Sequence, residues 1–185
     1  MKKEDCIAHK TNLSPNNWLP SSIPNPGNWD DYLDILYPKY LDIYQNNKNK
    51  LQFDNKPVSC RRDPKSIGKD YTFWHLTSYS LTKGTPEEDR IPDFDRCERL
   101  AWARAIIENA YTSKNILVYN NFRKTPGGKK NKTKCLLLIP EKYLVVLLIK
   151  RNYYMLKSAY LLEHKKSQIK CMKEYCAFKN ITTCS

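Results

Sequence analysis

Apolar residues recur at helical spacing in two segments of the first 110 residues. In residues 29–44 they fall at steps of three and four, which predicts a helix that Pro38 should break or kink. A second helix is expected from residue 94 or 95 to residue 109, with Asp95 as its N-cap. Residues 1–28 are rich in Asn, Pro and Ser, and this composition predicts an irregular lead-in.

Beyond residue 110 the apolar period changes to two, which indicates β-strands. The expected strands are Ile116–Asn120, Lys134–Ile139, Tyr143–Lys150 and Tyr153–Leu162. The third of these is apolar on both alternations, as is typical of a central strand covered on two sides. Lys165 to Ala177 predicts a closing basic helix. The pattern favours an α+β fold with N-terminal helices, a four-stranded antiparallel sheet in a meander and a C-terminal basic helix.

Composition excludes several classes of protein. No stretch approaches the roughly 18 apolar residues of a membrane-spanning helix, and no secretory signal follows the N-terminus, so a cytoplasmic protein without a membrane partner is expected. The seven cysteines are odd in number and scattered, which argues against a disulfide framework and favours reduced thiols. Their spacing also gives little support for a structural zinc site.

Charge is distributed unevenly along the chain. Residues 1–113 carry 16 Lys/Arg and 16 Asp/Glu, whereas residues 114–185 carry 16 Lys/Arg and three acids, so the whole net charge of +13 lies in the last 72 residues. Such asymmetry predicts a basic surface for a polyanion, and the interleaved aromatics favour nucleic acid over an acidic protein. The expected nucleic-acid-binding cations are Arg123, Lys124, Lys129, Lys130, Lys132 and Lys157.

His75 is the histidine best placed for chemistry, within the aromatic run of residues 71–76. A histidine beside two aromatic residues is often a core residue with a satisfied ring. Its ordinary pKa near 6.5 also suits a general base or acid. Both interpretations remain open from the sequence, and so does whether this run is a strand or the start of a helix.

Arg96 and Arg99 are neighbours on the second predicted helix, about 60° apart around its axis and on the side of the apolar stripe. Arginines that point towards a core need anionic partners because they cannot shed their proton. The partners are either Asp93, Asp95 or Glu98 within the chain, or a scissile phosphate whose transition-state charge the pair would stabilise.

The last predicted strand carries two hydroxyl groups two residues apart, on Ser158 and Tyr160. Alternation places Tyr154, Leu156, Ser158 and Tyr160 on one face of this strand. The hydroxyls are either ordinary strand chemistry or groups that bind a phosphate and orient a base. With only three acids, the basic half offers no carboxylate set for Mg²⁺, so a nuclease working there would need no metal cofactor. RNA permits this because its own 2′-OH can attack the adjacent phosphate.

Four stretches together resemble the phage-associated BECR nucleases, a fold group named for barnase, EndoU, the ribonuclease colicins and RelE. They are Phe73-Trp74-His75-Leu76, Arg96-Cys97-Glu98-Arg99-Leu100-Ala101-Trp102, Tyr143-Leu144-Val145-Val146 and Tyr154-Met155-Leu156-Lys157-Ser158-Ala159-Tyr160. The resemblance covers residues 70–177, so residues 70–185 are interpreted as a BECR-like nuclease domain and residues 1–69 as an N-terminal extension. Ser158 departs from the family's Thr-Ala-Tyr pattern but keeps a hydroxyl.

This resemblance implies a metal-independent endoribonuclease that works by 2′-OH transesterification, with His75, Arg96, Arg99, Ser158 and Tyr160 as catalytic residues. It also implies RNA as the substrate, a toxin or phage-defence role, and a possible antitoxin or immunity protein as partner. The alternatives are a non-catalytic nucleic-acid-binding protein and a protein-interaction module that uses the same basic sheet.

Overall fold

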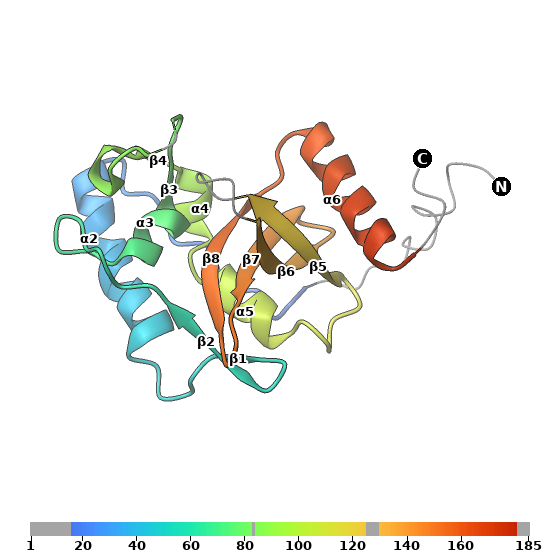
Figure 1. Cartoon of the computed structure of the whole chain (residues 1–185). Helices are drawn as coiled ribbons and strands as arrows, with labels where there is room; N and C mark the ends of the chain where they lie inside the picture. Colours follow the sequence, from blue (N-terminus) through green and yellow to red (C-terminus); the bar gives the residue numbers. More distant parts are fainter. Residues whose placement is uncertain (1–15, 83, 125–129, 181–185) are drawn as a thin grey trace.

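A curled six-stranded sheet forms the centre of the protein (Figure 1). The computed structural model describes residues 16–82, 84–124 and 130–180. The strand order is β1-β2-β8-β7-β6-β5, and the class is α+β, as the sequence predicts. The strands are β1 (Gln52–Phe53), β2 (Lys56–Cys60), β5 (Ile116–Lys124), β6 (Lys130–Leu138), β7 (Tyr143–Ile149) and β8 (Tyr154–Leu161).

The predicted sheet of four strands was too small. Strands β5 to β8 are antiparallel neighbours near their expected positions, but β2 adds to the edge of β8 in parallel and β1 pairs with β2. These two strands could not be predicted because β1 has only two residues, and β2 contains Pro57 and no clear apolar alternation. Residues 29–60, interpreted as part of an extension, therefore contribute two strands to the same sheet as the basic half.

The predicted N-terminal helix forms as α2 (Trp29–Tyr40), and the Asn28 side chain caps it by accepting from the Asp30 backbone N–H at 2.8 Å. The helix continues through Pro38 instead of ending there. It then widens into a π-helical turn, η1 (Leu41–Gln45). In a π-turn the backbone hydrogen bonds join residues five apart instead of four. Helices commonly absorb a local irregularity in this way.

The second predicted helix is split into α4 (Phe94–Glu98) and α5 (Trp102–Glu108). Its N-cap is Asp93, whose carboxylate accepts from the Arg96 N–H at 3.1 Å, and not Asp95 as predicted. Arg99 leaves the helical conformation, with ψ at +23°.

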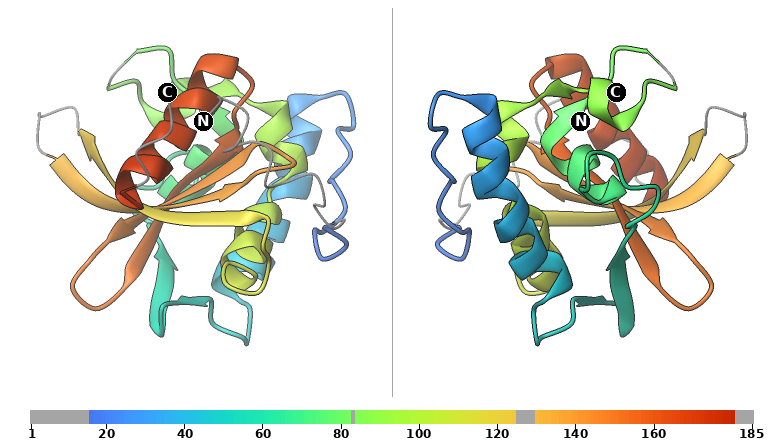
Figure 2. Two further views of the ribbon diagram at one scale, coloured as in Figure 1. Left: turned by 90° about the vertical axis from the view of Figure 1, so that its right-hand side faces the viewer. Right: turned by 90° about the vertical axis from the view of Figure 1, so that its left-hand side faces the viewer.

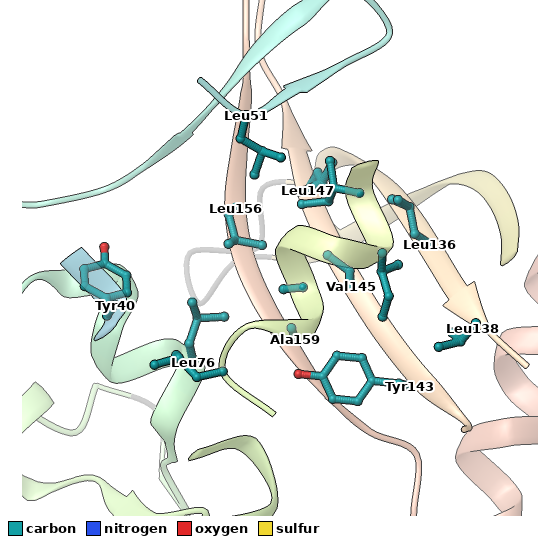
Figure 3. Packing of buried hydrophobic residues seen from close by; sticks show 14 of the residues in the cluster. Tyr40, Leu51, Leu76, Leu136, Leu138, Tyr143, Val145, Leu147, Leu156 and Ala159 are labelled. Atoms are coloured by element: carbon teal, nitrogen blue, oxygen red, sulfur yellow. The ribbon is translucent and has the colours of Figure 1, made fainter. Parts of the chain in front are cut away.

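Two apolar cores lie on opposite faces of the sheet. The larger core joins α2, α3 (Tyr71–Thr77) and α5 to alternate residues of β6, β7 and β8, and Figure 3 labels ten side chains of this core. The smaller core lies under α6 (Lys165–Phe178), which packs on β5 through Cys171, Met172 and Tyr175. Figures 1 and 2 show α2 and α6 on opposite sides of the sheet. Strand β7 is buried on both alternations, which confirms its predicted central place.

A β-bulge interrupts β8 at Lys157. Val146 pairs with Ser158 but Leu147 pairs with Leu156, so Lys157 is an extra residue in the strand. Leu156 and Ala159 consequently share the larger core, whereas Ser158 and Tyr160 face the side of Val146 and Leu144. The prediction that Leu156, Ser158 and Tyr160 share one face was wrong, because simple alternation does not survive an inserted residue.

The β1–β2 turn is fixed to the sheet by the carboxylate of Asp54. It accepts hydrogen bonds from Tyr111 and from Tyr154, the latter at 2.8 Å, and lies 3.4 Å from the Lys134 ammonium. Burial acts to raise the pKa of Asp54, but these two hydroxyls and the ammonium outweigh it and lower the pKa below its ordinary value. Asp54 adopts a positive φ of 49°, a conformation that Asn also tolerates.

Asp54→Asn should therefore lower the free energy of unfolding at pH 7 by roughly 1–2 kcal/mol without disturbing the turn. Because the folded-state pKa is below the unfolded one, this contribution is present above about pH 4 and is lost as pH falls through the folded pKa. Urea unfolding from pH 7 to pH 3 should show the free energies of unfolding of the parent and of Asp54→Asn converging. Asp34→Asn, at an exposed position of α2, is the control. A difference between parent and Asp54→Asn that stays constant with pH would contradict the prediction.

Among the cysteines that the structure describes, Cys176 in α6 differs from the prediction because it is disulfide-bonded. Cys60, Cys97, Cys135 and Cys171 form no disulfide, as expected. A disulfide is uncommon in a reducing compartment. Across the parts of the chain that the structure describes, no helix has the length and apolar character needed to span a membrane.

Candidate functional site

Helix α3 brings His75 to the edge of β8 at the point where β2 ends. Its first turn is joined to the chain leaving β2, because Thr72 N–H donates to Arg61 O at 3.0 Å and Arg61 N–H donates to Thr72 Oγ1 at 2.8 Å. Its apolar residues Phe73, Trp74 and Leu76 lie in the larger core. The aromatic run is thus a helix that holds His75 against β8.

Three of the predicted catalytic residues meet around the backbone of His75. The carbonyl oxygen of His75 accepts from Ser158 Oγ and from Arg96 Nη1, each at 3.4 Å. Arg96 Nη1 also donates to Ser78 O at 2.9 Å, and its Nε lies 2.7 Å from Asp93 Oδ2. The Arg96 guanidinium lies 5.2 Å from the centre of the Tyr160 ring. The structure therefore brings His75, Arg96, Ser158 and Tyr160 together.

The His75 imidazole lies between an aromatic ring and a carboxylate. Its ring is 4.3 Å from the ring of Tyr71, over which the Arg61 guanidinium stacks at 4.2 Å. Its Nε2 lies 3.5 Å from Glu87 Oε1 without forming a hydrogen bond. Its side chain is 19% exposed. His75 is therefore neither sealed in hydrocarbon nor satisfied as an ordinary core histidine would be.

Four cations surround this imidazole, and with Glu87 they define what we call the His75 cluster: Arg61, Arg90, Arg96, Lys157, Glu87 and His75. Burial, followed by the charges of Arg90, Lys157, Arg96 and Arg61, lowers the pKa of His75 to about 3. The imidazole is accordingly neutral at physiological pH, and the cluster retains three positive charges after Glu87 is counted. A site of this charge suits one or two phosphate groups.

Glu87 and Arg90 are members of the cluster that the sequence analysis missed. Both come from the charged segment that begins with η2 (Glu87–Asp89), and their side chains are only 15% and 8% exposed. Arg90 donates to Ser78 Oγ at 3.0 Å and to Ser78 O at 2.9 Å, and its Nε lies 3.6 Å from Glu87 Oε2. In the sequence, the i,i+3 spacing of Glu87 and Arg90 was the one feature that could have indicated their ion pair.

One oxygen of the Glu87 carboxylate is held away from water. This atom, Oε2, is shielded from solvent and makes no hydrogen bond. Burial raises the pKa of Glu87, although Arg90 and Arg61 act against it. Buried polar atoms without hydrogen bonds are costly, so they occur mainly where a function retains them.

Arg99 does not join the cluster. Its Nη1 lies 2.6 Å from Asp95 Oδ1 and 3.7 Å from Glu98 Oε2, and its guanidinium lies 5.2 Å from the Trp102 ring centre. The prediction that Arg96 and Arg99 form one clamp fails because the helix breaks at Arg99. The internal ion pair is the correct interpretation for Arg99.

Two of the predicted nucleic-acid-binding cations, Lys130 and Lys132, also lie apart from the cluster. Lys130 and Lys132 lie on the same face of β6 as Lys134 and Leu136, which is the face of the larger core. Ser158 and Tyr160 lie on the other face of the sheet. Lys129 and the side chains of Arg123 and Lys124 lie outside what the structure describes. Lys157 is the predicted cation that the structure places near His75, since the bulge presents it there.

No family model, curated protein or solved structure matches this chain. Within the described residues, no group of three His, Cys, Asp or Glu side chains lies close enough to hold a metal ion. The chemistry of the His75 cluster is therefore the guide to function.

Proposed function

We propose that this protein is a metal-independent endoribonuclease with a BECR-type fold, cleaving single-stranded RNA by attack of the 2′-OH on the adjacent phosphate. One observation carries the proposal: an imidazole and a partly buried carboxylate, 3.5 Å apart, lie among four cations at the edge of a sheet. A toxin or phage-defence effector acting on cytoplasmic RNA, with an antitoxin or immunity protein as its partner, would fit this activity.

Glu87 is the general base in this proposal. A carboxylate with a raised pKa is a stronger base than a solvated one, and at neutral pH it takes the proton of the 2′-OH. His75 is neutral, so we assign it a different role from the general base or acid expected from the sequence. Its ring N–H donates a hydrogen bond to the phosphoryl group, a role that a lowered pKa preserves.

Lys157 is the general acid. The leaving 5′-oxygen needs a proton, arginine cannot supply one, and the imidazole is neutral. The ammonium of Lys157 remains as the proton donor of the cluster. The 2′-oxygen forms a bond to phosphorus while the bond from phosphorus to the 5′-oxygen breaks. The products are a 2′,3′-cyclic phosphate and a 5′-hydroxyl.

The three arginines stabilise charge on the phosphoryl oxygens. Arg90 and Arg96 are held by the carbonyl of Ser78, so their guanidinium groups are fixed before substrate binds. Arg61 is exposed and stacks on Tyr71, so its guanidinium can contact the RNA strand as the strand binds. Preorganised charge of this kind is among the largest contributions to catalysis in enzymes.

Incubation of the purified protein with end-labelled single-stranded RNA in EDTA tests the function directly. Cleavage that persists in excess EDTA supports the proposal, whereas intact RNA or a strict Mg²⁺ requirement would remove it. A DNA strand of the same sequence should remain intact.

Two substitutions of Lys157 separate its charge from its proton. Lys157→Arg keeps the charge but removes the proton donor, so cleavage should fall by roughly 10²-fold with RNA affinity unchanged. Lys157→Met should lower both cleavage and affinity. Single-turnover cleavage and equilibrium RNA binding measure the two effects, and an Arg variant as active as the parent would refute the acid role.

A second candidate is a non-catalytic nucleic-acid-binding protein, favoured by a feature on the other face of the sheet. Phe122 is an exposed aromatic residue directly across from Lys132 in the β5–β6 ladder. An exposed ring beside a cation is a typical platform for unpaired bases. If RNA is bound but never cut, and Phe122→Ala abolishes binding while Glu87→Gln does not, this candidate is preferred.

A further inference from the structure

A pocket of about 580 Å³ adjoins the His75 cluster on the side of α6. It lies between β3 (Ser78–Tyr79), β4 (Ile91–Pro92), the start of α4 and the segment that joins β8 to α6. Its volume is in the range of small-molecule sites, roughly 300–1,000 Å³. Arg96 of the cluster lines it, and so does Tyr160, whose ring lies against the Arg96 guanidinium.

Apart from Arg96, the charged side chains that line this pocket are acidic, whereas most of those in the cluster are cationic. Asp93, Asp95 and Glu163 line it, and no phosphate would settle beside these carboxylates. Asp93 and Asp95 are already paired with Arg96 and Arg99. Glu163 is exposed, and among the described residues its carboxylate has no ion-pair or hydrogen-bond partner.

Aromatic rings supply the apolar part of the lining. Tyr79 and Phe94 are both partly exposed there, and the Tyr160 ring carries the Arg96 guanidinium on one side. Flat aromatic and guanidinium surfaces are what proteins use to stack an unpaired base. The pocket thus combines stacking surfaces with a hydrogen-bond acceptor next to a phosphate site.

We infer that this pocket binds a nucleobase adjacent to the phosphate held by the His75 cluster, and that Glu163 selects bases carrying an amino group. The inference rests on the proposed function, since Arg96 would contact the phosphate that the selected nucleotide carries. A carboxylate accepts hydrogen bonds from the amino groups of guanine, adenine and cytosine. Uracil has no amino group: its two carbonyl oxygens are repelled by a carboxylate, and its single N3–H is the one donor on that edge.

The test measures binding of GMP, AMP, CMP and UMP to the full chain by titration calorimetry, which requires no cleavage. The amino-bearing nucleotides that fit should bind roughly tenfold or more tightly than UMP. Glu163→Gln should reduce that ratio several-fold, because the amide can donate to a uracil carbonyl. Tyr79→Ala should weaken binding of all four by about the same factor, and Asp34→Asn on α2 should change nothing.

Equal affinity for all four nucleotides, no binding of any of them, or an unchanged ratio in Glu163→Gln would overturn the inference. The same variants in RNA cleavage keep the two proposals distinct. If RNA is cut without base preference, the base-selecting role of the pocket is rejected and the nuclease function is retained. If the protein binds nucleotides selectively but cuts no RNA, the nuclease function is rejected and the nucleotide-binding pocket is retained.

Discussion

Glu87→Gln is expected to lower the rate of RNA cleavage by roughly 10²–10⁴-fold while RNA affinity is unchanged or rises. The amide has nearly the same shape as the carboxylate but cannot accept the proton of the 2′-OH. It also removes the one negative charge of the His75 cluster, so the four cations attract RNA more strongly. Single-turnover cleavage and fluorescence anisotropy with a 2′-O-methyl RNA give the two numbers.

Glu88→Gln is the matched control, because this adjacent carboxylate is fully exposed and accepts from Ser66 Oγ away from His75. Its cleavage rate should stay within about twofold of the parent. If Glu87 served only to neutralise part of the positive charge of the cluster, Glu87→Gln would bind RNA more tightly and cut it at least as fast. That result would exclude the general-base role.

The pH dependence of kcat/KM should follow Glu87 and not His75. A general base works when ionised, so activity is lost as pH falls through a pKa that lies above the ordinary 4.5 of a glutamate. His75, with its pKa near 3, stays neutral across the accessible range. The profile should therefore show no change of slope near pH 6.5. A loss of activity as pH rises through 6.5 that disappears in His75→Gln would contradict the assignment of the pH dependence to Glu87.

Arg96→Lys is expected to lower cleavage by about 10²-fold and the free energy of unfolding by roughly 1.5–3 kcal/mol. Lysine keeps the positive charge but cannot reach Ser78 O, His75 O and Asp93 Oδ2 together, as the guanidinium does. The loss would come both from transition-state stabilisation and from the contact between α3 and α4.

Arg99→Lys distinguishes this effect from a general change in basic residues. Arg99 pairs with exposed Asp95 outside the cluster, so its replacement should alter cleavage less than about threefold. Cleavage and urea unfolding of both variants complete the comparison. Equal losses of cleavage rate and of unfolding free energy in the two variants would show that Arg96 has no specific role in the cluster.

The elements with strong periodicity could be predicted from the sequence, and the site could be predicted only in part. The two-residue alternation from residue 116 gave four strands and the central place of β7, because burial on one or both faces leaves a direct mark on residue type. His75, Arg96, Ser158 and Tyr160 were also identified, and the structure brings them together.

What could not be predicted depends on irregularities of one or two residues. The helix break at Arg99 separates two arginines that helical spacing makes neighbours, and the bulge at Lys157 reverses the facing of Ser158 and Tyr160. Neither leaves a periodic signal. Glu87 and Arg90 come from an irregular segment, where no repeat relates sequence position to side-chain direction. Only their tertiary contacts show that these side chains are largely shielded from solvent.

The most direct measurement uses a DNA oligonucleotide containing a single ribonucleotide, incubated with the protein in EDTA. Cutting should occur only on the 3′ side of that ribose and should leave a 2′,3′-cyclic phosphate and a 5′-hydroxyl. Replacing its 2′-OH by 2′-O-methyl should abolish the reaction. Cleavage of the methylated strand, or products that end in a 5′-phosphate, would contradict transesterification at the His75 cluster.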